Sequence, residues 1–88
     1  DDPVQTAQIY AKATGIVCGL LFADETIRLI DPEATVEHCL KDGDPVSPGT
    51  VLLKIRARAS TCFAIERAAL DWIQQLSGIA TKTRRYLD

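Results

Sequence analysis

One arginine in the second half of the chain has the surroundings of a residue that binds an anion. The sequence around it has the period of an amphipathic helix with one apolar face. Arg67 lies roughly opposite the centre of that face, with Phe63 one turn before it and Leu70 three residues after it. Solvent exposure alone poorly explains an arginine between two apolar side chains, so we expect this second face to meet another domain or subunit. The alternative is a surface pair between Arg67 and Asp71. The residues of the expected core face are Cys62, Ile65, Ala68, Ala69, Trp72, Ile73 and Leu76.

The other reactive side chains give weaker signals. Glu66 lies near the edge of the expected core face, where we expect a local salt bridge or a capping role. The three cysteines are far apart and form neither a C-x-x-C pair nor a zinc-ligand spacing. We therefore expect no metal site, and three reduced, partly buried thiols in a cytosolic protein. The cysteines are Cys18, Cys39 and Cys62.

Charge is divided unevenly along the chain. Residues 1–50 carry three basic and nine acidic side chains, a net charge of −6, whereas residues 51–88 carry seven basic and three acidic ones, a net charge of +4. A basic second half suggests contact with an anion. The acidity of the whole chain, and the lack of aromatic residues between the basic ones, argue against nucleic acid. No apolar run approaches the roughly 18 residues that span a bilayer, so we expect no membrane segment.

Periodicity along the chain predicts an α+β domain with one small sheet. Asp31-Pro32 should end the first helix, because a residue before proline avoids the helical region. Ser60 or Thr61 offers an N-cap for the second. After Ser77 we expect a further helix that carries Lys82, Arg84 and Arg85 on a solvated face. The expected elements are a strand over 5–19, a helix over 19–30, a strand over 35–44, a strand over 50–58, and helices over 62–76 and 78–88.

Two finer expectations concern the strands. Alternation over 50–58 places Val51, Leu53 and Ile55 on the core side, and Leu52, Lys54, Arg56 and Arg58 on the other. The turn-rich stretch "DGDPVSPGT" should direct Val46 inward. It resembles the turn of biotinyl and lipoyl carrier domains. A carrier domain would also need an acceptor lysine in a second hairpin, typically beside a methionine. This chain has no methionine and its next segment is a helix, so the stretch supports a hammerhead-like β motif without carrier chemistry.

Three stretches together resemble the N-terminal domain of the quinolinate phosphoribosyltransferase family, also called nicotinate-nucleotide pyrophosphorylase (carboxylating). They are "GIVCG" before a helix, "DGDPVSPGTVLLKI", and "ERAALDWIQQLSGIATKTRRYLD". Two positions depart from the family pattern: Asp71 stands in place of asparagine, and Ala57 in place of glycine. The G-D-x-T segment expected upstream and the barrel expected downstream are absent, so we expect residues 1–88 to be one domain cut from a longer enzyme. The matching positions are Glu66, Arg67, Leu70, Ser77 to Thr81, Thr83 and Arg84.

The resemblance implies an α/β-hammerhead N-terminal domain, with a small antiparallel or mixed sheet packed against helices, followed by an irregular α/β barrel. The implied enzyme joins quinolinate to phosphoribosyl pyrophosphate with Mg²⁺, and it releases pyrophosphate and CO₂ to give nicotinate mononucleotide. It also implies that subunits pair head to tail, so that the N-terminal domain of one covers the barrel mouth of the other.

Carried onto this sequence, the resemblance makes Arg67 a quinolinate ligand in the partner subunit's site. A guanidinium matches a carboxylate through two parallel hydrogen bonds. We expect Phe63 and Leu70 to seal the site and Glu66 to support it. No catalytic residue and no Mg²⁺ ligand falls in this segment, so the domain alone should be inactive. We expect a cytoplasmic enzyme whose partners are its own barrel and a second subunit.

Three other interpretations stay open at the level of sequence. A molybdenum-operon relative shares the fold, but its helix tends to read W-K-x-x-x-N where this chain has "ERAAL". A non-catalytic interaction or carrier module would need a modified lysine, for which Lys41 and Lys54 are the candidates. Nicotinate phosphoribosyltransferase shares the hammerhead domain, but its substrate has one carboxylate and less need of an added arginine.

Overall fold

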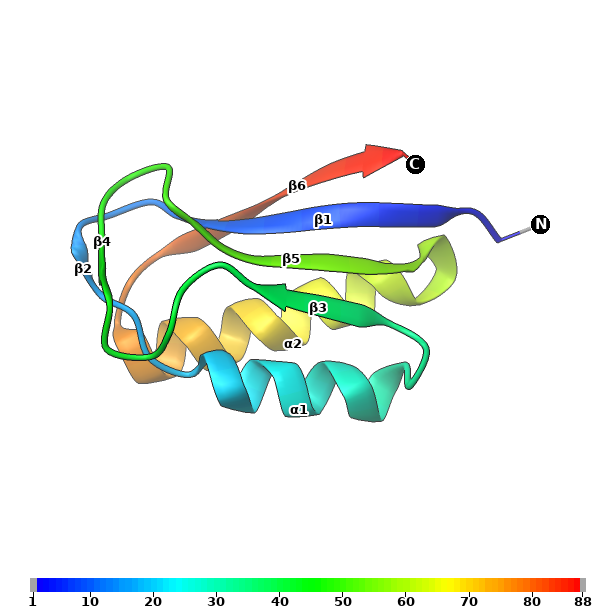
Figure 1. The fold of residues 1–88 in the computed structure, drawn as a ribbon, viewed down its shortest axis with the longest axis horizontal. Helices are drawn as coiled ribbons and strands as arrows, with labels where there is room; N and C mark the ends of the chain where they lie inside the picture. Colours follow the sequence, from blue (N-terminus) through cyan, green and yellow to red (C-terminus); the bar gives the residue numbers. More distant parts are fainter. Residues whose placement is uncertain (1, 88) are drawn as a thin grey trace.

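The structure is a computed structural model that describes residues 2–87. Figure 1 shows a sheet of long strands with two helices running beneath it. Apart from two very short strands, the element order is βαββαβ, which is the order of a split βαβ motif. The elements are β1 (Val4–Ala11), β2 (Gly15–Ile16), α1 (Leu20–Ile30), β3 (Thr35–His38), β4 (Pro45–Val46), β5 (Val51–Arg58), α2 (Ala59–Ser77) and β6 (Thr81–Leu87).

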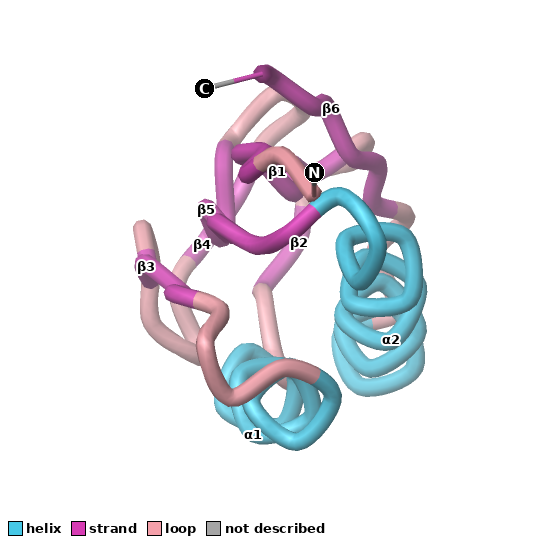
Figure 2. The backbone as a smooth tube through the Cα atoms, turned by 90° about the vertical axis from the view of Figure 1, so that its right-hand side faces the viewer, coloured by secondary structure: helices cyan, strands magenta, loops and turns pink. Residues whose placement is uncertain are grey.

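The main sheet is antiparallel, with the strand order β3-β5-β1-β6. Both helices cover one face of this sheet and pack against each other, as the view along the strands shows (Figure 2). The α+β prediction is therefore confirmed. Within residues 2–87, no helix combines the length and the apolar character that crossing a bilayer requires.

The core lies between the sheet and the two helices. Gly19 allows the helices to approach closely: it has a φ of 95°, and a Cβ atom there would lie 3.0 Å from the Trp72 carbonyl oxygen of α2. Val46 packs inward from the turn-rich loop, as predicted. The largest fully buried side chains are Ile9, Val17, Leu20, Ile27, Leu52, Leu53, Ile55, Cys62, Ile65 and Ile73.

The core face of α2 is rotated from the predicted one. Trp72 is half-buried and stacks on Phe22 of α1, with ring centroids 5.4 Å apart, and Leu76 is 45 % exposed. Glu66 is buried instead, within the core face itself. The rotation follows from the two surfaces that α2 must cover, because it contacts α1 as well as the sheet.

The start of α2 also differs from the prediction. The helix begins at Ala59, and neither Ser60 nor Thr61 is its N-cap. The carboxylate of Asp2 accepts hydrogen bonds from the Ser60 backbone N–H at 3.0 Å and from the Ser60 hydroxyl at 2.5 Å. An acidic group from a distant part of the chain thus satisfies a free N–H at the helix N-terminus. Thr61 donates to Asp31, which connects this turn to the end of α1.

Several strands are shorter than predicted, and the Leu52 side chain faces the core instead of solvent. β1 ends at Ala11, β3 ends at His38, and within residues 13–18 only Gly15 and Ile16 are strand. Leu52 is fully buried although alternation placed it outward. Ile9 pairs with Leu53 and Tyr10 pairs with Val51, so Leu52 is the extra residue of a bulge. A bulge interrupts strict alternation, which explains the wrong assignment.

The C-terminal segment is a strand and not the predicted helix. Gly78, with a left-handed φ of 69°, ends α2, and its N–H donates to the Gln74 carbonyl at 2.9 Å. Thr81 and Thr83 then pair with Ala11 and Ile9 along the edge of β1. β-Branched threonines favour a pleated strand, and the pairing partner lies seventy residues earlier in the sequence, where local periodicity cannot reveal it.

Candidate substrate-binding site

Arg67 lies on the outward face of α2, as the sequence predicts. Its side chain is exposed, and within residues 2–87 its guanidinium forms no ion pair. The alternative in which Arg67 pairs with Asp71 is therefore wrong for this structure. A guanidinium is always charged near neutral pH, so α2 presents an uncompensated positive charge with hydrogen-bond donors free for a ligand.

Phe63 lies beside Arg67, one helical turn earlier. Its ring is 59 % exposed, and the Cζ atom of Arg67 is 5.8 Å from the ring centroid. The Cζ atom of Arg85, on β6, is also 5.8 Å from the same centroid. Both distances fall within the range of cation–π attraction. The ring is thus a shared contact for two guanidinium groups that come from different elements.

Glu66 holds the second of these guanidinium groups. Arg85 donates from Nε to Glu66 Oε1 and from Nη2 to Glu66 Oε2, each at 2.7 Å. The Glu66 side chain is only 7 % exposed and that of Arg85 is 43 % exposed. A buried carboxylate requires such a partner, because the interior solvates charge poorly. Glu66 does form a salt bridge, but with a residue nineteen positions away and not with a local one.

Cys62 completes this cluster on the core side. Its thiol is fully buried and donates to Glu66 Oε1 at 3.5 Å. Burial, followed by the negative charge of Glu66 and the hydrogen bond to it, raises the pKa of Cys62 to about 11. The hydrogen bonds that Arg85 donates to Glu66 raise the pKa of the arginine. The thiol therefore stays protonated near neutral pH. All three cysteines are free, but only Cys62 is buried, while Cys39 is exposed, in contrast to the prediction of partial burial.

Leu70 lies elsewhere than predicted. It is half-buried and packs against the protein's own hydrophobic core, together with Trp72. Its side chain therefore lies partly between α2 and the rest of the domain. Of the four residues singled out on the sequence, Phe63 contacts Arg67, and Phe63 and Glu66 both contact Arg85. The fourth, Leu70, lies towards the core.

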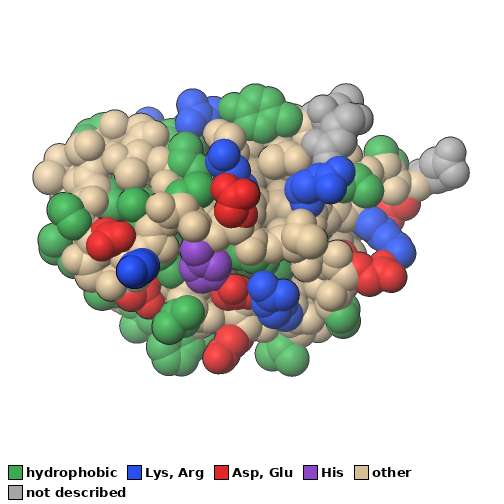
Figure 3. Space-filling view, in the orientation of Figure 1, with side chains coloured by type: hydrophobic (Ala, Val, Ile, Leu, Met, Phe, Trp, Pro, Cys, Tyr) green, Lys and Arg blue, Asp and Glu red, His purple; other side chains and the backbone are tan. Residues whose placement is uncertain are grey.

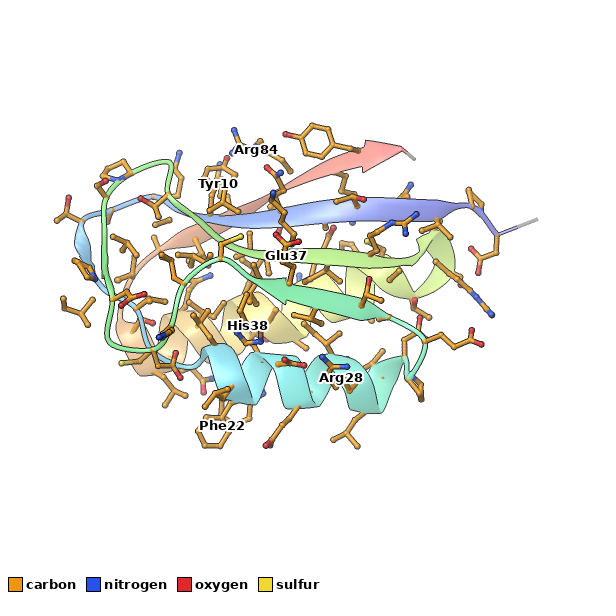
Figure 4. All side chains as sticks on the ribbon, viewed as in Figure 1. Tyr10, Phe22, Arg28, Glu37, His38 and Arg84 are labelled. Carbon is orange, nitrogen blue, oxygen red and sulfur yellow. The ribbon has the colours of Figure 1, made fainter. Side chains whose placement is uncertain are left out.

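Sequence reasoning missed the role of Arg85 in this region. Arg85 was assigned to a solvated helix face, whereas it is the partner of Glu66. Alternation along β6 was the available signal, because Thr81, Thr83 and Arg85 share one side of the strand and Lys82, Arg84 and Tyr86 the other. Arg84 points away from the helices and lies over Tyr10, with its Cζ atom 4.4 Å from the ring centroid (Figure 4).

A second charged cluster, also missed, joins α1 to β3. Asp24 accepts a hydrogen bond from Arg28 Nε at 2.5 Å, and its other oxygen lies 2.6 Å from His38 Nε2. Figure 4 shows His38 pointing from β3 towards α1, while Glu37 points to the other side. Burial acts to raise the pKa of Asp24, but the hydrogen bonds from Arg28 and His38, with their charges, outweigh it and lower the pKa. The spacing of Asp24 and Arg28 on the helix was the available signal.

Basic side chains also occur on the other face of the sheet, and two of them lie beside acidic ones. Lys54 lies 3.8 Å from Glu37, and Arg58 pairs with Glu33. The space-filling view of the side that carries His38 shows Lys and Arg interspersed with Asp and Glu (Figure 3). This side of the domain therefore has no extended patch of one charge. Arg67 differs from Lys54 and Arg58 because no acidic side chain among residues 2–87 pairs with it.

The structure thus defines a small α+β domain whose longest helix carries, on its outer face, an arginine with no ion pair among residues 2–87. A family model described as quinolinate phosphoribosyl transferase, N-terminal domain, matches residues 1–77, and the chain belongs to that family. The resemblance seen in the sequence is thereby confirmed.

Individual relatives agree with the family assignment. A nicotinate-nucleotide pyrophosphorylase (carboxylating), chloroplastic, from Arabidopsis thaliana is 39 % identical over 93 % of this chain and 24 % of its own length. Quinolinate phosphoribosyltransferase (decarboxylating) 1b from Nicotiana tabacum is 34 % identical over 99 % of this chain and 25 % of its own length. This chain thus spans about a quarter of those relatives.

Solved structures show the same fold. The nicotinate-nucleotide pyrophosphorylase of Francisella tularensis superposes with a TM-score of 0.83 at 27 % identity, covering 89 % of this chain and 28 % of that one. NadC from Streptococcus pyogenes superposes with a TM-score of 0.81 at 30 % identity, covering 88 % of this chain and 28 % of that one. The predicted fold class is therefore confirmed by comparison as well as by the structure itself.

Proposed function

We propose that this chain is the substrate-covering domain of an enzyme that converts quinolinate and phosphoribosyl pyrophosphate to nicotinate mononucleotide, pyrophosphate and CO₂ in NAD biosynthesis. Family membership supports the proposal, and so do relatives named as decarboxylating quinolinate phosphoribosyltransferases. We place the catalytic barrel that the resemblance implies in the three quarters of those relatives that this chain does not span. Alone, the chain should have no turnover.

The observation that carries the proposal for this domain is the guanidinium of Arg67, which lies on an outward face and forms no ion pair with any residue between 2 and 87. Quinolinate is a flat pyridine with two carboxylates, and a guanidinium binds a carboxylate through two parallel hydrogen bonds. We propose that Arg67 binds one quinolinate carboxylate in the barrel of a second subunit. In a homodimer, the hammerhead-like domain of each subunit would then cover the other's barrel mouth.

Exclusion of water should strengthen this contact. Electrostatic attraction grows as the local dielectric constant falls, so a carboxylate enclosed between α2 and a barrel is bound more tightly than one in open solvent. The exposed ring of Phe63 beside Arg67 offers an apolar surface for such an enclosure. Leu70 would contribute less, since it already packs against its own core.

Mg²⁺ would act with phosphoribosyl pyrophosphate in the barrel. Within residues 2–87, no three histidine, cysteine or carboxylate side chains are grouped so that they could hold a metal ion, and we assign no Mg²⁺ ligand to this domain. A cytoplasmic location stays a prediction. Some plant relatives carry the names chloroplastic or mitochondrial, so the compartment varies within the family.

The test is the substitution Arg67→Ala in the enzyme that joins this domain to its barrel. We expect kcat/KM for quinolinate to fall by the equivalent of about 2–4 kcal/mol, the range for truncating one partner of a buried charge pair. The KM for phosphoribosyl pyrophosphate should stay nearly unchanged. Arg67→Lys should restore only part of the activity, because an ammonium cannot form two parallel hydrogen bonds.

Arg84→Ala is the matched control, because Arg84 is also an exposed arginine over an aromatic ring but lies on the opposite side of the sheet. It should leave both kinetic constants near those of the unmodified enzyme. An equal loss for both substrates in Arg67→Ala would point instead to damaged packing between subunits and would contradict the proposed role.

A further inference from the structure

We infer that Phe63 is a positioning residue, which holds the Arg67 guanidinium in the orientation that a carboxylate ligand requires. The kinetic part of this inference rests on the proposed function above, whereas the contact itself is a property of this chain. The two residues are four positions apart on α2, so their side chains lie on the same face of the helix, one turn from each other.

The exposure of Phe63 is the first step. A large aromatic side chain that is 59 % exposed forgoes much of the free energy that burial would give. Its ring instead lies 5.8 Å from the Arg67 Cζ atom, and the quadrupole of the ring attracts a guanidinium at that distance. Because an exposed arginine otherwise samples many rotamers, this attraction reduces the freedom that Arg67 would lose on binding a ligand.

The second step is the different state of the two arginines beside the ring. Arg85 lies at the same distance from the ring as Arg67, but both carboxylate oxygens of Glu66 accept its hydrogen bonds. Glu66 therefore compensates the charge of Arg85 and holds the Arg85 guanidinium beside the Phe63 ring. Of these two arginines, Arg67 has no ion pair among the described residues 2–87, so this face offers one guanidinium and should bind one carboxylate at a time.

The contact can be tested on the chain of residues 1–88 by NMR. A guanidinium held near a ring should show an upfield ring-current shift of the Arg67 side-chain protons, and Phe63→Leu should abolish it. Phe22→Leu is the matched control, since Phe22 is also an exposed phenylalanine but stacks on Trp72. Arg67 proton shifts that do not change in Phe63→Leu would overturn the inference.

The positioning role is tested by kinetics in the enzyme that carries the barrel. Phe63→Leu keeps the apolar bulk and removes the ring, so we expect the KM for quinolinate to rise by about two- to fivefold, the size of an exposed cation–π contact. The KM for phosphoribosyl pyrophosphate should not change, and Phe63→Tyr should behave like the unmodified enzyme. In the Arg67→Ala background, Phe63→Leu should have no further effect, because the ring acts through Arg67.

The two experiments separate failure of the inference from failure of the proposed function. If Phe63→Tyr is as impaired as Phe63→Leu, or if Phe63→Leu adds its full effect in the Arg67→Ala background, the positioning role is wrong. If Arg67→Ala itself leaves the quinolinate KM unchanged while the ring-current shift is present, the contact stands and the proposed function fails.

Discussion

Two charged clusters in this domain have similar components and different states. On α1 and β3, Asp24 binds both Arg28 and His38, so one carboxylate pairs with two basic groups. On α2 and β6, both oxygens of Glu66 accept hydrogen bonds from Arg85, and Arg67, the next residue along the helix, has no anionic partner in the part of the chain that the structure describes. In the first cluster every charged group has a partner of opposite charge, whereas in the second Arg67 has none among the described residues.

The difference shows how a structural cluster can be distinguished from a ligand site. A surface ion pair contributes little to stability, and its groups are satisfied by each other. An unpaired guanidinium beside an exposed ring gains from neither burial nor pairing within its own domain. A partner outside the domain is the simplest reason for that arrangement, and the predictions below are chosen to compare the two clusters directly.

The largest difference should appear in the alkylation of cysteines, because one thiol belongs to the Glu66 cluster and another directly follows His38 in the sequence. Cys62 donates to Glu66 and is fully buried, whereas Cys39 follows His38 and is exposed. Burial acts first, and the charge of Glu66 second, to raise the pKa of Cys62 to about 11, so little reactive thiolate exists at pH 8. Iodoacetamide should modify Cys39 faster than Cys62 by a factor on the order of 10³ or more, because Cys62 reacts only after the domain opens.

Peptide mass spectrometry over time measures the two rates in one sample. Cys18, which is partly buried, should react at an intermediate rate. Urea above the unfolding midpoint should bring the three rates close together. Similar rates for Cys39 and Cys62 under native conditions would show that the Glu66 cluster is open to solvent, contrary to the structure.

The next largest effect should come from Arg85→Ala. Truncation leaves the buried Glu66 carboxylate without its two hydrogen bonds, and breaking a buried pair costs about 3–5 kcal/mol. Arg85 is 43 % exposed, so water can partly replace it, and we expect a loss of about 1–3 kcal/mol in the free energy of unfolding. Urea denaturation followed by Trp72 fluorescence measures this loss. Lys82→Ala, an exposed neighbour on the other side of β6, is the control and should unfold at nearly the same urea concentration as the unmodified chain.

A smaller, pH-dependent effect is expected for Asp24→Asn. The folded-state pKa of Asp24 lies below the ordinary value of an aspartate, because hydrogen bonds from Arg28 and His38 outweigh the effect of burial. A lowered pKa means that the carboxylate stabilises the fold fully above the pKa of the unfolded chain. That contribution is lost as the pH falls through the folded-state value. At pH 7 we expect Asp24→Asn to cost about 1 kcal/mol or less.

Thermal unfolding at pH 7, 5 and 3 tests the sign of this dependence. The difference between the unmodified chain and Asp24→Asn should be similar at pH 7 and 5, and smaller at pH 3. A difference that grows on acidification would show that Asp24 does not hold the low pKa that its partners imply.

Local patterns were sufficient for most of the fold. The limits of α1 follow from its helical period and from Asp31-Pro32, and the loop around Val46 follows from its glycines and prolines. What local patterns could not give was pairing at long range. β6 is a strand because β1 has a free edge beside it, and α2 begins at Ala59 because Asp2 reaches its first turn.

The same limit applies to the site. Arg67 and Phe63 could be found because their separation on one helix fixes which face they share. Arg85 could be found only once residues 81–87 were recognised as a strand, because alternation along that strand sets the side on which it lies. The burial of Glu66 also follows from that strand, because a carboxylate is excluded from a core face unless a cation reaches it.

The smallest effect on stability should come from Arg67→Ala, in contrast to the loss expected for Arg85→Ala. Arg67 has no anionic partner in the described part of the chain and only one exposed ring contact, so its loss should change the free energy of unfolding by less than about 0.5 kcal/mol. Urea denaturation of Arg67→Ala beside Arg85→Ala gives the comparison in one experiment. A loss for Arg67→Ala as large as that for Arg85→Ala would mean that both arginines stabilise the domain itself, and α2 would then have no spare cation to offer a ligand. A neutral result, joined to the expected loss of quinolinate binding in the enzyme, would separate the two roles: Arg85 stabilises the fold through Glu66, and Arg67 is left free for the substrate.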